Sequence, residues 1–185
     1  MESIGDTRLL YTLLVLLVAL ERGLELLVSR RNAQRVLSRG GVEIGASEFR
    51  WMASMHAAFL VACPLEVWLL GRPWIAPLGW AMLALLGLTM GLRYWVVATL
   101  GERWNTRIIC LPGAPLIETG PYRWMRHPNY FAVVLEMLAL PLIHGAWLSA
   151  LVFGACNALV LRTRIRTEDA ALAHYSSATA HGSLR

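Results

Sequence analysis

Residues 120–130 read GPYRWMRHPNY and join a polar loop to a very apolar C-terminal hairpin. The stretch contains two arginines, one histidine and two tyrosines, and Pro121 and Pro128 restrict its backbone. A loop that only connects two helices needs to be polar and flexible, whereas this one is aromatic, cationic and conformationally restricted. These properties predict a cofactor pocket at a membrane surface, where the polar loop meets the apolar hairpin.

The composition of the chain is that of an integral membrane protein. Hydrophobic residues make up 57% of the 185 residues, and the mean hydropathy is +0.51; soluble domains are about 45–50% apolar. A membrane-spanning helix needs roughly 20 mainly apolar residues. The apolar blocks are residues 8–28, 51–71, 75–98, 130–144 and 146–162, of which the last two are short. We therefore expect an all-α, polytopic membrane helix bundle with about five transmembrane helices and a cytoplasmic cofactor-binding region.

The blocks predict one integral membrane domain over residues 1–185. Three N-terminal helices occupy residues 1–100, and the cofactor loop, the helical hairpin and a cytoplasmic helix extension occupy residues 101–185.

The positions of the arginines predict the topology. All seventeen basic residues are arginine, and most follow the first, third and fifth blocks. The opposite side has only Arg8 and Arg72. By the positive-inside rule the N-terminus lies outside and the C-terminus is cytoplasmic. The net charge of +5 then indicates a face towards anionic lipid and not a nucleic-acid partner.

Two polar segments separate the blocks on the arginine-rich side. Residues 29–50 contain three glycines and are expected to form a cytoplasmic loop on the membrane. Residues 101–129 contain four prolines, so they are expected to form an ordered irregular loop or a pair of short elements. The three cysteines are isolated and have no metal-ligand spacing, so no metal site is expected.

Several ionisable residues lie within the apolar blocks. Glu21 and Glu25 are four residues apart and fall on one helical face. The others are His56, Glu66, Arg93 and Glu136. Ionisable groups at membrane depth are costly and usually face the bundle interior. They indicate either inter-helix pairs, such as Arg93 with a carboxylate, or a polar pocket within the bundle.

The fifth block runs directly into the charged segment 162–169. If its helix continues, Asn157, Leu161, Arg164 and Glu168 share one face. A guanidinium can hold an anionic oxygen by two parallel hydrogen bonds, and a carboxylate can accept from ribose hydroxyls or an ammonium group. The alternative is an i,i+4 surface pair of Arg164 and Glu168 with little energetic weight.

Two motifs in residues 101–175 resemble those of the isoprenylcysteine carboxyl methyltransferase family of integral membrane enzymes. That family carries Gly-x-Tyr-x-x-x-Arg-His-Pro-x-Tyr before a helical hairpin, and Arg-x-x-x-Glu with a second acid after it. The matching residues are Gly120, Tyr122, Arg126, His127, Pro128 and Tyr130 in the first motif, and Arg164, Glu168 and Asp169 in the second.

The resemblance implies a role for each of these residues. S-adenosylmethionine would be the cofactor and S-adenosylhomocysteine the product, with Arg164 and Glu168 as catalytic residues. Arg164 would hold the methyl-accepting oxygen, and Asn157 and Arg126 would also contact the acceptor. The cofactor contacts would be Ala114, Pro115, Leu116, Ile117, Tyr122, His127, Pro128, Asn129, Tyr130 and Glu168. The chain departs from the family at Ala114, where His is frequent, and at Arg107, where Gln is frequent.

The N-terminal half resembles a bacterial branch of the family that is associated with O-methylation of alkylpyrones made by type III polyketide synthases. The matching stretches are Glu21-Arg22…Glu25, Ser29-Arg30-Arg31-Asn32, Arg39-Gly40-Gly41-Val42-Glu43 and His56…Phe59-Leu60…Glu66. This resemblance implies a lipophilic acceptor that enters from the bilayer, a place in a polyketide pathway, and the bacterial inner membrane as location.

Methyl transfer also suits the residue types. The reaction needs alignment and an anionic oxygen more than it needs a strong base, and the motifs are rich in arginine. Three alternatives stay open at this point. They are a phospholipid N-methyltransferase, an NADPH-dependent membrane reductase of the sterol-reductase type, and a non-enzymatic membrane scaffold.

Overall fold

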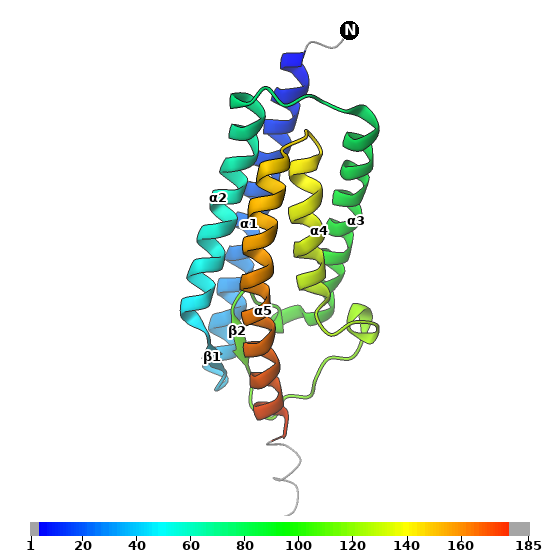
Figure 1. Ribbon diagram of the computed structural model, residues 1–185. Helices are drawn as coiled ribbons and strands as arrows, with labels where there is room; N and C mark the ends of the chain where they lie inside the picture. Colours follow the sequence, from blue (N-terminus) through cyan, green and yellow to red (C-terminus); the bar gives the residue numbers. More distant parts are fainter. Residues whose placement is uncertain (1–3, 178–185) are drawn as a thin grey trace, which may run out of the picture.

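A computed structural model describes residues 4–177, which form a bundle of five α-helices with a small extension at one end (Figure 1). The helices are α1 (Ile4–Ser38), α2 (Ala46–Leu69), α3 (Ala76–Leu100), α4 (Pro128–Leu142) and α5 (Trp147–Ser177). The extension consists of strands β1 (Val42–Ile44) and β2 (Ile108–Cys110) and the short 3₁₀ helices η1 (Gly101–Arg103) and η2 (Gly120–Arg123).

The fold is the expected all-α membrane helix bundle. Three helical stretches are long and apolar enough to cross a membrane, namely Ala46–Leu69, Ala76–Arg103 and Trp147–Tyr175. The other two helices differ from these for simple reasons. Helix α1 carries Glu21, Arg22 and Glu25 within its apolar run, and α4 has 15 residues, which span only about 22 Å.

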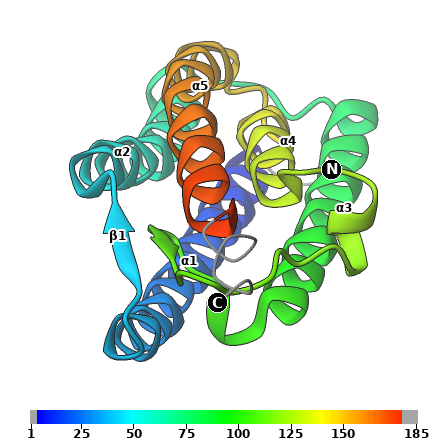
Figure 2. The same cartoon turned by 90° about the horizontal axis from the view of Figure 1, so that it is seen from below.

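The outer surface of the bundle is as apolar as its core. Large side chains such as Trp51, Leu88 and Leu151 are exposed, which is typical of a lipid-facing surface. Inside, the core includes Phe59 from α2 and Leu140 from α4. Seen from below, α4 and α5 lie between α2 and α3 (Figure 2).

The expectation of a loop over residues 29–50 is wrong for residues 29–38, because α1 continues to Ser38, and for residues 46–50, because α2 begins at Ala46. The buried residues of this part are Ser29, Asn32, Ala33 and Val36, which follow the i, i+3, i+4, i+7 spacing of one helical face. This face packs against the loop after α3. Its polar residues occupy the positions at which apolar residues would have indicated an amphipathic helix. Gly40, with φ of 87°, lies in the turn after the helix.

Residues 101–129 form short elements joined by irregular backbone, as expected from their prolines. Strand β2 pairs with β1 in antiparallel register, with Val42 opposite Cys110 and Ile44 opposite Ile108. The loop is also tied to α1. The Asn32 Nδ2 donates to the Trp104 carbonyl at 2.9 Å, and the Thr106 backbone N–H donates to Ser29 Oγ at 3.0 Å. These bonds fix Trp104 and Thr106 beside the end of the bundle.

Candidate active site

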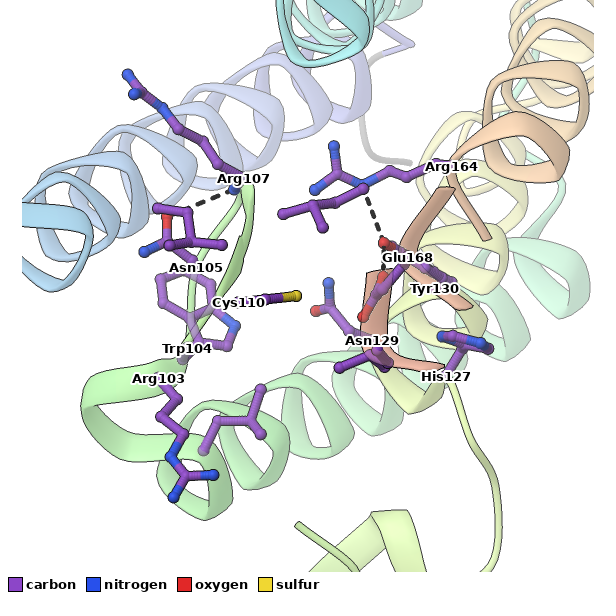
Figure 3. Close-up of a pocket in the computed structure, with 14 residues that line it drawn as sticks. Arg103, Trp104, Asn105, Arg107, Cys110, His127, Asn129, Tyr130, Arg164 and Glu168 are labelled. Atoms are coloured by element: carbon purple, nitrogen blue, oxygen red, sulfur yellow. Dashed lines mark hydrogen bonds between the residues drawn. The ribbon is translucent and has the colours of Figure 1, made fainter. Parts of the chain in front are cut away.

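The extended helix α5 presents its buried face to the N-terminal end of α4. Asn157, Leu161 and Arg164 are all buried on this face, so the predicted helical continuation is confirmed. Arg164 is only 4% exposed. Its Nε donates to the Tyr130 hydroxyl at 3.0 Å, and its Nη2 donates to the backbone carbonyl of Thr106 (Figure 3). One side-chain partner and one backbone partner therefore hold the guanidinium in one orientation.

The two sequence motifs meet around Tyr130. The Tyr130 hydroxyl donates to a carboxylate oxygen of Glu168, and the His127 ring stacks on the Tyr130 ring with centroids 5.3 Å apart. The next acid, Asp169, lies 3.2 Å from His127 Nε2 and accepts from Arg126 Nη2 at 3.1 Å. Residues about forty positions apart in the chain thus form one cluster of hydrogen-bonded groups.

A large cavity opens beside this cluster between the loop 101–126 and the end of α5. We call it the loop cavity; its volume is about 670 Å³, within the range of roughly 300–1,000 Å³ that small-molecule sites occupy. Its walls include Ala114, Pro115, Leu116, Ile117, Tyr122 and Glu168. Burial, and secondarily the charge of Glu168, raises the pKa of the Tyr122 hydroxyl well above its usual range, so this group stays a neutral hydrogen-bonding group.

A second cavity lies within the helix bundle. This bundle cavity has a volume of about 280 Å³ and mainly apolar walls. Met52, Ala53, Phe59 and Leu60 of α2 form one side of it, and Val133 belongs to the α4 side. Tyr130 and Arg164 also line the bundle cavity, so an apolar chamber ends at a fixed guanidinium.

A small junction cavity of about 100 Å³ lies between the other two. It shares Glu168 and Cys110 with the loop cavity, and Tyr130 and Arg164 with the bundle cavity. Four buried atoms of its lining residues have no hydrogen-bond partner within the described chain: Nη1 of Arg164, Nε1 of Trp104, Nδ2 of Asn105 and Oδ1 of Asn129. The junction therefore offers three unused donors and one unused acceptor. Burial raises the pKa of the Cys110 thiol, so this side chain is a neutral part of the wall.

The predicted cofactor contacts divide between two cavities. Ala114 to Ile117, Tyr122 and Glu168 line the loop cavity, whereas His127, Asn129 and Tyr130 line the junction. Pro128 is fully buried and is the first residue of α4, where its missing N–H has no helical partner to lose.

Two predicted acceptor contacts lie elsewhere. Arg126 is largely exposed, pairs with Asp169 and lines the loop cavity. It does not line the bundle cavity. Its position therefore favours contact with a molecule in the loop cavity over contact with the acceptor. Asn157 is buried on the inner face of α5, and its Oδ1 has no partner among residues 4–177.

Sequence reasoning missed the parts of the site that come from the loop after α3. The carbonyl of Thr106 orients Arg164, and the fully buried Trp104 lines both the junction and the bundle cavity. Trp104 lies six residues after the end of the third apolar block, and its large aromatic side chain within a polar segment was the available signal. A backbone carbonyl carries no residue-type signal, so Thr106 could not have been found in this way.

Ion pairs join most of the ionisable residues within the bundle. Arg93 on α3 donates to Glu25 on α1 through Nε at 2.7 Å and Nη2 at 2.6 Å. The predicted pairing of Arg93 with a carboxylate is therefore confirmed. Glu66 accepts from Arg72 Nε at 2.9 Å and from the backbone N–H groups of Leu148 and Ser149, so it caps the beginning of α5.

Over residues 4–177, no group of three or more His, Cys, Asp or Glu side chains is arranged to hold a metal ion. The loop cavity instead combines apolar walls with the Glu168 carboxylate and with the guanidinium groups of Arg103, Arg123 and Arg126. This set suits an organic molecule that carries both hydroxyl or ammonium donors and a carboxylate.

One family model and two known proteins match large parts of this chain. The model of the isoprenylcysteine carboxyl methyltransferase family matches residues 81–174, which include α4, most of α5 and the loop before α4. A Bacillus subtilis protein described as uncharacterized protein YpbQ is 37% identical over 169 residues, which are 90% of this chain and 99% of that protein. An uncharacterized Haemophilus influenzae protein is 28% identical over 150 residues, which are 80% of this chain and 86% of that protein. No solved structure matches.

Proposed function

This chain belongs to the isoprenylcysteine carboxyl methyltransferase family, and we propose that it transfers a methyl group from S-adenosylmethionine to an ionised oxygen of a lipophilic acceptor. The family itself indicates a membrane methyltransferase. The observation that supports the finer proposal is the position of Arg164, at the junction between a polar cavity open to the loop region and an apolar cavity within the bundle.

The loop cavity suits S-adenosylmethionine in size and in donor set. Glu168 offers a carboxylate for the ribose hydroxyls or the ammonium group, and the backbone of Ala114 to Ile117 offers further polar atoms. When bound, the cofactor supplies an activated methyl group on a positively charged sulfur. The residues of this chain bind and orient that group; Tyr130 and His127, stacked at the junction, exclude water from the space between the two cavities.

The acceptor oxygen would be held at the junction by Arg164. The Nε and Nη2 atoms of this guanidinium are fixed by Tyr130 and Thr106, while Nη1 has no partner among the described residues. A buried, oriented and unused donor on a cation is suited to an anionic oxygen. A carboxylate or acidic enol is already ionised near neutral pH, so the site needs no strong base, and its contribution is alignment of the two reactants.

We propose an alkylpyrone-like polyketide as the acceptor, because two of the four N-terminal stretches that resemble the alkylpyrone branch also supply walls of the bundle cavity. These are the region of Arg22 and Glu25 on α1 and the region of His56 on α2. The protein would act in the bacterial inner membrane beside a type III polyketide synthase pathway, with its N-terminus outside and its C-terminus cytoplasmic.

Phospholipid N-methylation is less consistent with the site. The amine of phosphatidylethanolamine is cationic unless it is deprotonated, and the buried guanidinium of Arg164 would repel it. An NADPH-dependent reductase is less consistent with the family match, which indicates a methyltransferase.

The proposal is tested by methyl transfer from labelled S-adenosylmethionine to lipids extracted from the source membranes. Wild-type protein is compared with a Glu168→Gln variant. We expect label in an enol ether or ester of an apolar lipid, and a large loss in the variant. Label in phosphatidylethanolamine derivatives would favour N-methylation instead, and the absence of any labelled lipid with wild-type protein would contradict the proposal.

A further inference from the structure

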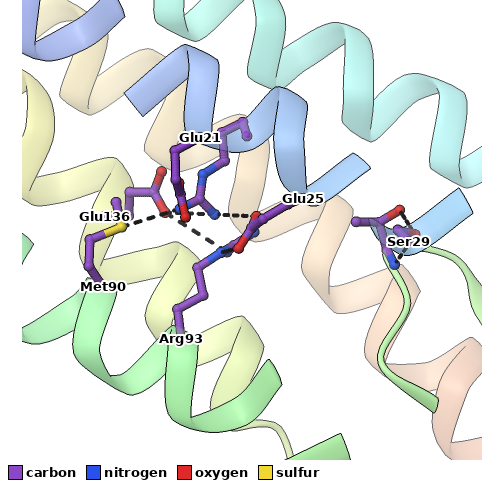
Figure 4. A network of polar contacts seen from close by, with 8 residues as sticks. Glu21, Glu25, Ser29, Met90, Arg93 and Glu136 are labelled. Carbon is purple, nitrogen blue, oxygen red and sulfur yellow. Dashed lines mark hydrogen bonds and ion pairs between the residues drawn. The ribbon is translucent and has the colours of Figure 1, made fainter. Parts of the chain in front are cut away.

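Charged side chains from three helices meet beside the bundle cavity, away from Arg164 (Figure 4). Glu21, Arg22 and Glu25 come from α1, Arg93 from α3 and Glu136 from α4. Arg93 and Arg22 both donate to the Glu25 carboxylate, at 2.6–2.7 Å and 2.8 Å. Arg22 also donates to Glu21. Three carboxylates thus face two guanidinium groups, and the hydrogen bonds of these groups go to Glu25, to Glu21 and to the Met90 sulfur.

Glu136 is the carboxylate left over. It is only 6% exposed, yet its Oε2 lies 3.6 Å from Arg22 Nη1 and 3.9 Å from Arg93 Nη1, beyond ordinary hydrogen-bond length. Within residues 4–177 no side chain or backbone group donates a hydrogen bond to it. The nearby guanidinium charges stabilise this carboxylate, but it receives no hydrogen bond from the described residues. It can therefore accept a hydrogen bond from a molecule in the cavity that it lines.

His56 on α2 provides a second free acceptor in the same cavity. Its Nδ1 lies 2.8 Å from the backbone carbonyl of Met52. Because a carbonyl only accepts, the hydrogen resides on Nδ1, and Nε2 of the neutral ring becomes an acceptor. Glu136 and His56 thus present two acceptors and no donor, so the matching ligand group is a donor such as a hydroxyl.

The two ends of the bundle cavity carry different groups. On α4, Asn129, Val133 and Glu136 follow each other at i, i+4 and i+7 and all line the cavity. Tyr130, which bonds Arg164, precedes Glu136 by six residues, or about 9 Å along the helix axis. Arg164 therefore marks one end. The other end carries the acceptors of Glu136 and His56 beside Arg22 and Arg93, whose hydrogen bonds go to other residues. A plain alkyl chain placed across this distance would cover Glu136 without giving it a donor.

We propose that Glu136 and His56 form a second anchor that binds a hydroxyl group of the acceptor while Arg164 holds the oxygen that is methylated. This inference rests on the proposed function, since it assigns the bundle cavity to the acceptor. The acceptor class is then a lipophilic molecule with an ionised oxygen and, several bonds away, a hydroxyl donor. A saturated fatty acid has the first group and lacks the second.

The test uses fatty acids as competitors of labelled methyl transfer to extracted lipids. A saturated acid is compared with a series of acids of the same chain length that carry one hydroxyl at different positions. The series measures the distance between the carboxylate and the preferred hydroxyl position. For wild-type protein we expect one hydroxyl position to strengthen competition about fivefold to tenfold over the parent acid, as one additional hydrogen bond does.

Two variants remove the second anchor. His56→Phe keeps an aromatic ring of similar size, and Glu136→Met leaves two arginines with the two carboxylates Glu21 and Glu25. In both we expect the hydroxyl preference to disappear while the parent acid competes as before. Leu65→Ala, at an exposed position of α2, is the control and should keep the preference. Binding of S-adenosylhomocysteine to each variant shows that it is folded.

Equal competition by all acids with wild-type protein would overturn the second anchor, and so would a preference that survives in both variants. If Glu136→Met does not fold, His56→Phe and His56→Gln decide, because Gln restores an acceptor oxygen and should restore part of the preference. A wild-type protein that neither binds S-adenosylhomocysteine nor labels lipids would refute the proposed function itself. Methyl transfer without any hydroxyl preference would refute only the second anchor.

Discussion

Replacement of Arg164 by lysine probes the junction most directly. The substitution keeps the positive charge but removes the planar fork that donates to Tyr130 at 3.0 Å, to the Thr106 carbonyl, and through Nη1 to the proposed anionic oxygen. A single ammonium cannot satisfy three directions set by a fork. The acceptor oxygen should therefore lose one charge-assisted hydrogen bond, which contributes about 1.5–3 kcal/mol.

This loss predicts that kcat/KM for the lipid acceptor falls about tenfold to 150-fold. The affinity for S-adenosylhomocysteine should change less than about twofold, because Arg164 lines the junction and the bundle cavity and is absent from the walls of the loop cavity. The assay is initial-rate transfer of labelled methyl to lipid, together with calorimetric titration of the product nucleoside.

Arg162→Lys is the matched control, since Arg162 is exposed on the same helix two residues earlier. It should behave as wild type in both measurements. The reasoning would be refuted by an Arg164→Lys protein that transfers methyl at the wild-type rate. It would equally be refuted by one whose only defect is weaker binding of S-adenosylhomocysteine.

Three further changes separate the parts of the site. Glu168→Gln removes a cofactor-facing charge from the loop cavity, and titration should show at least about tenfold weaker S-adenosylhomocysteine binding; unchanged affinity would argue against this contact. Ala53→Phe fills the bundle cavity, so steady-state kinetics should show a higher acceptor KM at unaltered S-adenosylhomocysteine affinity, and a wild-type KM would place the acceptor elsewhere. Asn32→Ala removes the 2.9 Å bond to the Trp104 carbonyl and should reduce stability by about 1–2 kcal/mol in thermal unfolding; a wild-type Tm would show that this bond does not hold the loop.

The sequence was sufficient for the bundle and for the inner face of α5. Long apolar blocks can only be buried as helices in lipid, because each helix satisfies its own backbone hydrogen bonds. The continuation of α5 through the charged segment followed from the shared face of Asn157, Leu161 and Arg164, which the structure buries together.

The parts that could not be predicted depend on contacts between distant segments. The helical residues 29–38 carry Ser29 and Asn32 on their buried face because these side chains bond the backbone of residues 104–106. In the sequence alone, these polar residues are indistinguishable from those of a surface loop, because the segment that they bond is not known. The pairing of β1 with β2 joins two three-residue strands some sixty residues apart, and segments of this length carry too little periodicity to be recognised.

The candidate site was likewise predicted only in part. The residue types in the two motifs predicted a cluster, and the hydrogen bonds of Tyr130 to Arg164 and Glu168 bring that cluster together. The separation into a loop cavity, a junction and a bundle cavity depends on how α4 and α5 pack against the loop. No spacing within one segment carries that information, so the sequence did not indicate that Arg126 lines the loop cavity.

Calorimetric titration of the detergent-purified protein with S-adenosylhomocysteine and then with NADPH tests the central claim most directly. We predict saturable binding of S-adenosylhomocysteine to wild-type protein, strong weakening of that binding in Glu168→Gln, and no binding of NADPH. Binding of NADPH alone would contradict the methyltransferase account in favour of a reductase, and binding of neither nucleotide would favour a membrane scaffold.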